Sequence, residues 1–353
     1  MMAADVPLQV YGGVDTHKDV HVAAVTDHAG RVLGTASFPV TPDGYAGLLD
    51  WLNGHGELAR AGVEGTGSYG AGLARYLAAR GVRVLEVNRP DRQRRRRHGK
   101  SDPVDAVAAA MTALRDDGDA GTPKTQDGPA AALQALRAAR RGAVKARTQA
   151  MNQLKALIIT APDQVRARLG GQRRKPLAAA CAALAGQDAP GPDAGTVTAL
   201  ASIGRRWLDL DAETARLEDA MTPLVTAAAP GLPEDTLGAG PQSAAALVIT
   251  AGDNPGRVRR ESGFAAMCGV SPVDCSSGKQ QRHRLNRGGD RQANSALWRI
   301  AQSRIQHDPR TQAYLDKRTA EGKTRKEAVR CLKRYIARQY WKAHIRPAIT
   351  TTG

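Results

Sequence analysis

Four acidic side chains in the first third of the chain have a spacing that could build a metal site. Asp15 ends the segment GGVD and Glu64 ends AGVE, so each follows a short apolar run typical of a strand. Asp102 and Asp105, in KSDPVDA, are three residues apart at the expected start of a helix and share one face. Clustered carboxylates repel one another unless a cation lies among them, and Mg²⁺ prefers oxygen ligands. Such a site predicts that the chain cuts or joins nucleic acid.

The elements that must position these acids follow the order β-β-β-α-β-α-β. The predicted strands are 9–15, 20–27, 31–40, 59–64 and 82–87, and the predicted helices begin near Thr41 or Asp43 and at Ser68. This is the order of a ribonuclease-H-like domain, although other α/β folds also alternate strands with helices. A further helix is predicted to begin with Asp102 as its N-cap and Pro103 at its first position.

Helical spacing dominates the middle of the chain, after a polar linker at 116–128. Apolar residues recur at helical spacing over 129–169, where Pro162 is expected to interrupt the helix, and again over 196–228. Residues 170–195 are mixed in character and rich in glycine and proline. Two long helices can pair as a hairpin or coiled coil, so this region is a candidate dimerisation arm.

The last third begins with a glycine turn, GAG, within residues 236–253. A helix end, this turn and a second helix predict a helix-hairpin-helix, whose backbone amides at a helix N-terminus could hold a phosphate. A final helix over about 323–343 is densely basic.

The charge balance favours a polyanionic partner. The 353 residues include 51 Lys and Arg against 34 Asp and Glu, a formal net charge of +17. No segment approaches about 18 uninterrupted apolar residues, and the N-terminus lacks the pattern of a secretory signal, so we expect no membrane partner. The four cysteines form no CxxC pair, which favours reduced thiols in a cytoplasmic, nucleoid-associated protein.

A dense basic stretch, NRPDRQRRRRHGK, directly precedes the predicted Asp102 helix. Its cations include Arg92, Arg94, Arg95, Arg96, Arg97 and Lys100. One interpretation of such a run is a simple solvated charge patch. Beside a metal centre, however, it would contact phosphates and concentrate nucleic acid there. We therefore expect these residues to bind nucleic acid.

A second chemical candidate is the segment CSSGKQQRHRLNRGGDRQ. Ser276 and Ser277 precede a glycine and a basic segment that we also expect to contact nucleic acid. Its cations include Lys279, Arg282, Arg284 and Arg287. A serine hydroxyl can attack a phosphodiester where cations neutralise the phosphate. From the residues alone, however, an ordinary Ser-Ser-Gly turn in a DNA-binding loop is the favoured interpretation.

Two histidines, His17 and His21, lie near Asp15 in the sequence. Zinc ligation by them is conceivable, but strand alternation favours polar or substrate-facing positions. Neither is included in the predicted site.

One known family resembles this chain from about residue 9 to about residue 345. Its motifs are matched in order by GVDTHK, VEGTGSYG, KSDPVDA, the glycine hairpin, FAAMCGVSPVDCSSGK and NRGGDRQANSALWRIA. The family consists of insertion-sequence transposases, of the bridge-RNA-guided type, that pair a RuvC-like DEDD domain with a C-terminal catalytic-serine domain. The hairpin departs from it by reading LGAGP in place of a PGIG-like sequence, from which we expect a weaker turn but no lost chemistry.

The resemblance implies a division of the chain into three regions. These are an α/β RuvC-like nuclease domain at 9–118, a helical coiled-coil multimerisation region at 129–230, and a mainly α C-terminal domain at 231–346 with the hairpin and the serine loop. It also implies that the acidic tetrad binds one or two Mg²⁺ ions, and that the protein acts as a homo-oligomer, a dimer or a tetramer.

The resemblance also implies a nucleophile and two nucleic-acid partners. The family's serine precedes the glycine, five residues after a proline; with Pro272 this is Ser277, and Ser276 beside it is the alternative. The serine would form a phosphoserine link with a DNA strand. Members of the best-understood branch use a structured guide RNA that pairs with donor and target DNA.

The sequence thus predicts a DNA transposase that excises and inserts its element. One alternative is a Holliday-junction-type nuclease in which water attacks, with no covalent adduct. Another is a non-catalytic nucleic-acid-binding protein that is indifferent to magnesium. An actin-like sugar kinase has a related strand order, but the arginine cluster and the charge surplus argue against it.

Overall fold

A computed structural model of the chain describes residues 8–87, 101–116, 121–186, 193–232, 236–276 and 283–350. The chain divides into two compact units. Unit 1 comprises residues up to Gln126 together with Asn254–Arg257, and unit 2 comprises Asp127–Asp253 and the residues from Val258 onward. Within the described ranges, no helix is both long enough and apolar enough to cross a membrane.

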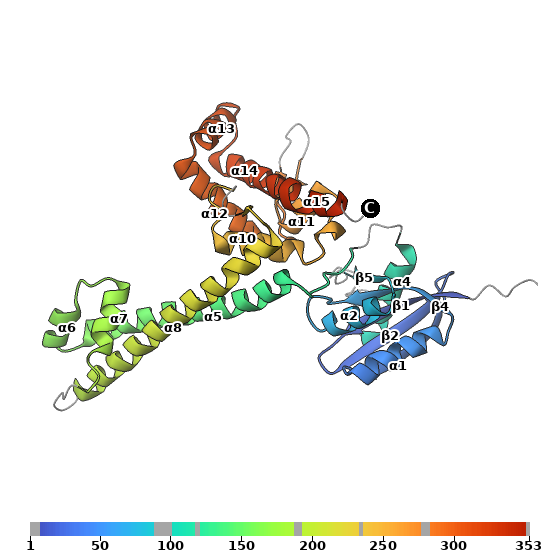
Figure 1. Cartoon of the computed structure of the whole chain (residues 1–353), viewed down its shortest axis with the longest axis horizontal. Coiled ribbons are helices and arrows are strands. Elements are labelled where there is room, and N and C mark those ends of the chain that lie inside the picture. Colours follow the sequence, from blue (N-terminus) through green and yellow to red (C-terminus); the bar gives the residue numbers. More distant parts are fainter. Residues whose placement is uncertain are drawn as a thin grey trace, which may run out of the picture. The chain divides into compact units, whose positions relative to one another are not determined.

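Unit 1 is built on a five-stranded mixed sheet (Figure 1). Its strands are β1 (Gln9–Thr16), β2 (Val20–Asp27), β3 (Val32–Pro39), β4 (Glu57–Glu64) and β5 (Val84–Val87), and its helices are α1 (Pro42–Asn53), α2 (Ala71–Ala79) and α4 (Asp102–Arg115). The strand order is β3-β2-β1-β4-β5, with β1–β2 and β2–β3 antiparallel and β1–β4 and β4–β5 parallel. This is the arrangement expected of a ribonuclease-H-like domain.

Helices α1 and α2 cover one face of this sheet. Leu48 and Leu52 of α1 and Leu73 of α2 pack against Val14 and Val63 of the two central strands. These strand residues alternate with the residues of the opposite face, because successive side chains of a strand point to opposite sides. Thr41 caps α1 by accepting a hydrogen bond from the Gly44 backbone N–H at 3.0 Å.

Helix α4 covers the other face and lies unusually close to the strands. A Cβ atom on Gly13 of β1 would come within 2.0 Å of the Ala110 nitrogen, and one on Gly62 of β4 within 2.5 Å of the Ala109 oxygen. Glycine is therefore required at both strand positions for the helix backbone to lie directly on the sheet. The helix contributes small side chains to this contact, including Ala106, which is fully buried.

The last part of unit 1 comes from a distant stretch of sequence. The 3₁₀ helix η1 (Pro255–Arg257) and Asn254 are held by the connection that follows α4. The Asn254 amide donates to the Pro123 carbonyl at 2.9 Å and accepts from the Thr125 N–H at 3.3 Å. Arg257 donates to the Thr122 carbonyl at 3.1 Å.

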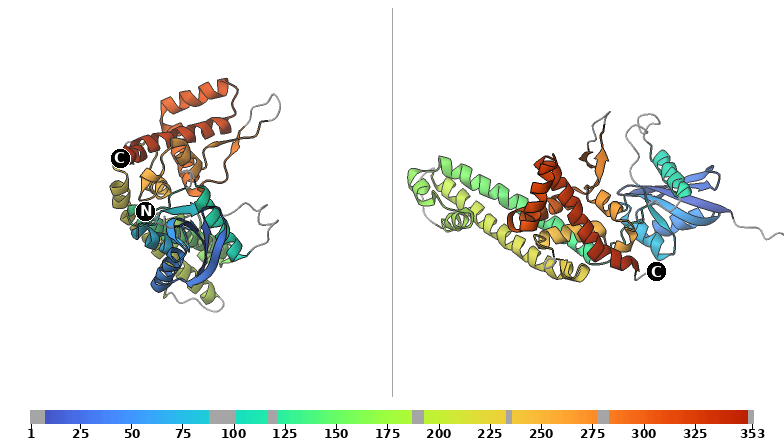
Figure 2. Two further views of the ribbon diagram at one scale, coloured as in Figure 1. Left: turned by 90° about the vertical axis from the view of Figure 1, so that its right-hand side faces the viewer. Right: turned by 90° about the horizontal axis from the view of Figure 1, so that it is seen from above.

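Unit 2 begins with a hairpin of two long helices, α5 (Pro129–Thr160) and α8 (Asp193–Ala228), which run side by side (Figures 1 and 2). Two ion pairs, Arg140–Glu218 and Arg147–Asp211, connect them. The short helices α6 (Asp163–Leu169) and α7 (Arg174–Ala182) pack at the far end of the hairpin around Leu154 and Leu200. We refer to these four helices as the arm.

The rest of unit 2 is mainly helical and shares its core with the near end of the arm. Its elements are α10 (Pro241–Ala251), α11 (Glu261–Met267), β6 (Pro272–Asp274), β7 (His283–Leu285), α12 (Arg291–His307), α13 (Pro309–Ala320), α14 (Arg325–Tyr340), the π-helix η2 (Trp341–Ile345) and α15 (Arg346–Thr350). Phe264 of α11, Leu297 of α12 and Ile336 of α14 lie in one core with Leu133 of α5 and Met221 of α8.

The predicted α/β region followed by a mainly helical remainder is confirmed, and several predicted details are corrected. The N-cap of α4 is Ser101, so Asp102 is the first helical residue rather than the cap. The helix predicted over 129–169 ends at Thr160, and Pro162 separates it from α6. Residues 170–195 contain helix α7, and the antiparallel β6–β7 pair had not been expected.

Candidate metal site and serine loop

The sheet register brings Asp15 and Glu64 to the same edge. Strands β1 and β4 are parallel and pair Val14 with Val63, so the residue that follows each lies next to the other. Because the two acids are in register, they also point to the same face, the face covered by α4. Asp15 and Glu64 are both buried, with 6% of each residue exposed.

The close packing of α4 places two further carboxylates at that edge. With Ala109 and Ala110 against the glycines of the central strands, the first turn of the helix lies at the carboxyl ends of those strands. Asp102 and Asp105 both belong to this first turn. Asp105 is 5% exposed, whereas the Asp102 side chain is 47% exposed. The first turn of a helix also favours carboxylates because unpaired backbone N–H groups point out of it.

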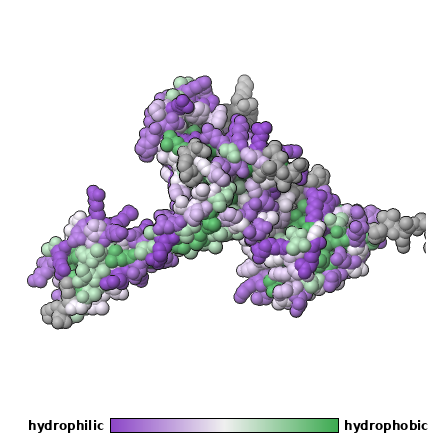
Figure 3. Space-filling model, viewed as in Figure 1, coloured by the Kyte–Doolittle hydropathy of each residue, from purple (hydrophilic) through white to green (hydrophobic). Residues whose placement is uncertain are grey.

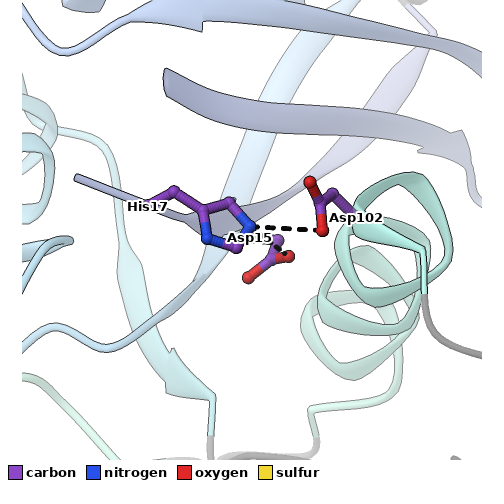
Figure 4. A group of neighbouring side chains, drawn as sticks. All are labelled: Asp15, His17 and Asp102. Atoms are coloured by element: carbon purple, nitrogen blue, oxygen red, sulfur yellow. Dashed lines mark hydrogen bonds and ion pairs between the residues drawn. The ribbon is translucent and has the colours of Figure 1, made fainter. Parts of the chain in front are cut away.

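His17 connects two of these acids, as Figure 4 shows. Its Nε2 lies 3.2 Å from Asp15 Oδ2 and 3.3 Å from Asp102 Oδ1. The ligand atoms of Asp15, His17 and Asp102 all lie within 4.8 Å of one another, which is close enough for one cation to reach all three. Glu64 and Asp105 are not part of this three-residue group. We call the four acids the carboxylate cluster.

Electrostatics in the carboxylate cluster are unfavourable without a cation. Burial raises the pKa of Asp15 above its ordinary value, the negative charges of Asp105 and Asp102 raise it further, and His17 lowers it. Asp105 is therefore close enough for its charge to act on Asp15. A cation would offset both the burial and the repulsion. The donors are mostly carboxylate oxygens, which suits a hard divalent ion such as Mg²⁺.

The two histidines near Asp15 lie in different surroundings. His17 was left out of the predicted site, although it lies two residues after Asp15 and so on the same side of the extended chain. His21 is fully buried and stacks on the Tyr45 ring at 5.8 Å, which corrects the expectation of a polar or substrate-facing position. Burial and the neighbouring His17 lower the pKa of His21.

The predicted basic stretch before α4 lies outside the described residues. This applies to Arg92, Arg94, Arg95, Arg96, Arg97 and Lys100. In the C-terminal loop it applies also to Ser277, Lys279 and Arg282. Arg284 of β7 and Arg287 beyond it are described, and both are exposed.

The described part of the serine loop ends at Ser276, two residues beyond β6. Ser276 is exposed, and its Oγ donates to Asp274 Oδ1 at 2.5 Å while its N–H donates to the same oxygen at 2.8 Å. The hydroxyl and backbone N–H of Ser276 lower the pKa of Asp274. Asp274 therefore orients Ser276 within the turn.

A hydrogen-bonded network fixes the chain that leads into β6. Asn294 of α12 donates to the Cys268 carbonyl at 3.2 Å and to the Gly269 carbonyl at 2.8 Å. Lys333 of α14 donates in turn to Asn294 Oδ1 at 2.9 Å. Gly269 has φ +65° and approaches Gly289 so closely that a Cβ on Gly289 would lie 2.2 Å from the Gly269 nitrogen. The CGVSP and NRGGD segments are thus held together.

Comparisons with known proteins find matches in both regions, the one with the carboxylate cluster and the one with the serine loop. Residues 12–160 match a DEDD family model of the IS110 type, described as "Transposase". Residues 234–316 match a model described as "Transposase IS116/IS110/IS902 family". The "Mini-circle putative transposase for IS117" of Streptomyces coelicolor is 34% identical over 158 residues, which cover 43% of this chain and 38% of that protein. In these two regions the chain is therefore similar to transposases of the IS110/IS116/IS902 family.

Proposed function

We propose that the chain is a DNA transposase that excises and inserts an insertion sequence by metal-dependent strand cleavage and exchange. The observation that carries this proposal is the meeting of Asp15, His17 and Asp102, from two distant stretches of sequence, at one sheet edge. The similarity of both regions to transposase family models supports DNA as the substrate.

The carboxylates of Asp15, Glu64, Asp102 and Asp105 would hold one or two Mg²⁺ ions. When bound, the metal acts as a Lewis acid on the phosphate oxygens. His17 orients the Asp15 carboxylate through its 3.2 Å contact. The burial of Asp15, Glu64 and Asp105 keeps water from competing for the carboxylate oxygens.

The attacking group is the hydroxyl of Ser277, with Ser276 as the alternative. Its Oγ loses its proton and forms a bond to the phosphorus of a DNA strand, the bond to one deoxyribose oxygen breaks, and that oxygen leaves as a hydroxyl after taking up a proton. Attack by a hydroxyl of a second strand on the phosphoserine ester then joins the strands and regenerates serine. The arginines of both basic segments neutralise the phosphates.

The partners are the element ends, the target DNA and a structured guide RNA. A net charge of +17 supports binding of more than one polyanion. The arm supports assembly of a homo-oligomer, because paired helices of this length offer a continuous surface to a second copy.

A gel experiment tests the chemistry. The full chain is incubated with labelled element-end DNA, Mg²⁺ and RNA from cells that carry the element, and the products are separated under denaturing conditions. We expect a DNA-linked protein band that disappears in Ser277→Ala and in Asp102→Ala, whereas Ser276→Ala keeps it. Cleavage without an adduct would instead favour a nuclease that uses water.

A matched control separates the carboxylate cluster from general charge effects. Asp43 lies in the first turn of α1, as Asp102 does in α4, and it is exposed and outside the carboxylate cluster. Asp43→Ala should keep full cleavage, and Asp102→Ala should still bind DNA and RNA. Full cleavage by Asp102→Ala would contradict the proposed metal site.

Metal binding can also be measured without any reaction. Mg²⁺ at about one hundred times its Kd should stabilise the wild-type protein by about 2.7 kcal/mol, because the ion binds only the folded state. Thermal unfolding with and without Mg²⁺ measures this gain. Asp102→Ala should lose most of the gain and Asp43→Ala should keep it; equal gains in both variants would remove the support for this site.

A further inference from the structure

A basic groove of about 530 Å³ lies in unit 2, between the β6–β7 pair and helices α13 and α14. Its cationic lining includes Arg284, Arg318, Lys323, Arg330, Lys333 and Arg338. Among the described lining residues the one carboxylate is Glu327, whose Oε2 accepts from the Thr324 N–H and hydroxyl in the capping box of α14. The groove therefore has a surplus of positive charge, although Arg318 pairs with Glu321 and Arg338 with Glu261.

The positive charge of Lys333 is poorly offset by the described residues around it. The residue is only 6% exposed, and its ammonium donates to the neutral amide oxygen of Asn294 at 2.9 Å. Within the described residues no carboxylate lies within ion-pair distance of it. Burial and the charge of Arg330 lower the pKa of Lys333. A buried ammonium in such surroundings favours an anion in the groove.

An exposed aromatic ring belongs to the same lining. Tyr335 is 51% exposed, and its ring meets the Tyr314 ring edge-on at a centroid distance of 5.7 Å and an interplanar angle of 80°. The Arg338 guanidinium lies 5.6 Å from the Tyr335 centroid. Figure 3 shows that the visible surface over α13 and α14 is mostly hydrophilic. A half-exposed tyrosine in this setting offers a flat stacking surface beside phosphate-binding cations.

We propose that this groove binds an unpaired segment of DNA, with Arg330 and Lys333 contacting phosphates and Tyr335 stacking on a base. Cations that follow a phosphate chain, combined with an exposed aromatic ring, are the features that bind single strands. In a duplex the faces of the bases are stacked on one another and a tyrosine ring does not reach them.

The groove lies next to the strands that carry the serine loop. Pro272 of β6 and His283 of β7 line the groove, and β6 leads directly to Ser276. Arg330 also donates to the His283 carbonyl at 3.4 Å, which connects α14 to the β6–β7 pair. The choice of DNA rather than RNA rests on the proposed function, since a DNA strand is what the serine would attack.

Fluorescence anisotropy with the full chain tests the proposal. The probe is a labelled oligothymidine of about 16 nucleotides, and a chelator is present so that binding is measured without cleavage. Tyr335→Ala should weaken binding roughly ten-fold, while Tyr335→Phe, which keeps the ring, should stay within about two-fold of wild type. Neither change should alter the affinity for a duplex of the same length.

Trp298 provides a matched control for the ring. It is 50% exposed, on α12, and does not line the groove. Trp298→Ala should stay within about two-fold of wild type. An equal loss in Trp298→Ala and Tyr335→Ala, or no loss in Tyr335→Ala, would overturn the proposal.

The phosphate contact has its own control on the same helix. Arg325 and Arg330 are both exposed residues of α14, but only Arg330 lines the groove. Arg330→Ala should reduce the slope of log affinity against log salt by about 0.7, and Arg325→Ala should leave it unchanged. Equal slopes in the two variants would contradict the phosphate contact.

Two further outcomes overturn the assignment of an unpaired DNA strand. Tighter binding of oligouridine, lost in Tyr335→Ala, would assign the groove to RNA. An equal loss of duplex binding in Tyr335→Ala would exclude single-strand selectivity. Because the measurement needs no metal, a protein that never cleaves DNA can still pass or fail it, so the two proposals are tested separately.

Discussion

The carboxylate cluster of unit 1 and the basic groove of unit 2 are positioned by different interactions. The acids lie at the ends of two central strands and in the first turn of α4, a helix whose backbone rests on glycines of the sheet. Most of the cations lie on α13 and α14, and side-chain hydrogen bonds through Asn294 and Lys333 connect α14 to the loop before β6.

This difference matches what each region is proposed to bind. A metal ion requires its ligands within a few tenths of an ångström, and backbone packing supplies that precision. A strand of nucleic acid tolerates many backbone arrangements, so long cationic side chains on a helix are sufficient to hold it. If this comparison is right, substitutions that displace the backbone should reduce the stability of unit 1 most. Substitutions of single side chains in unit 2 should have smaller effects on its stability or its affinity for nucleic acid.

The largest effect is expected from Gly13→Val. The new side chain would collide with the backbone of Ala106 and Ala110, so α4 would have to move off the sheet and the free energy of unfolding of unit 1 should fall by about 4 kcal/mol or more. Hydrogen exchange of β1 and β4, read by mass spectrometry, measures the loss. Gly67→Ala is the control, because nothing lies within 4 Å of its added methyl group. Unchanged protection in Gly13→Val would refute the close helix contact.

A smaller effect is expected from Asn294→Ala. This variant removes donors from the Cys268 and Gly269 carbonyls and the acceptor from Lys333, which should cost unit 2 about 2 kcal/mol. Urea unfolding followed by circular dichroism measures it. Asn286→Ala, where the exposed side chain donates to the Ala266 carbonyl at 3.5 Å and accepts from the Gly288 N–H at 2.9 Å, should cost less. If both variants lose the same stability, the network is not what holds the loop.

The smallest effect is expected from Glu261→Gln. Glu261 pairs with Arg334 and Arg338, both of which line the groove. Without that negative charge the groove is more positive, so oligothymidine should bind about two- to three-fold more tightly. Asp219→Asn on the arm, also a loss of one negative charge, should change the affinity less. Weaker binding by Glu261→Gln would argue that the pair holds the arginines in place for the strand.

The sequence predicts unit 1 better than it predicts unit 2. Apolar alternation locates the strands, and parallel strands place Asp15 and Glu64 at one edge without further information. His17 was missed because its role depends on Asp102, which lies far along the chain. Strands β6 and β7 have three residues each and are mostly exposed, so no apolar pattern marks them. Helix α7 lies in a segment rich in glycine and proline, and its helical state depends on packing of Leu177 and Cys181 in the arm.

The segment Asn254–Arg257 has a consequence for how the protein is made. Asn254 and Arg257 provide the hydrogen-bond partners of residues 122–125, yet the whole arm and α10 are translated before them. On the ribosome, the sheet and α4 can therefore form early, while residues 122–125 gain their hydrogen bonds to Asn254 and Arg257 only after residue 257 has emerged. Completion of unit 1 thus waits until the arm and α10, and so most of the chain, have been synthesised.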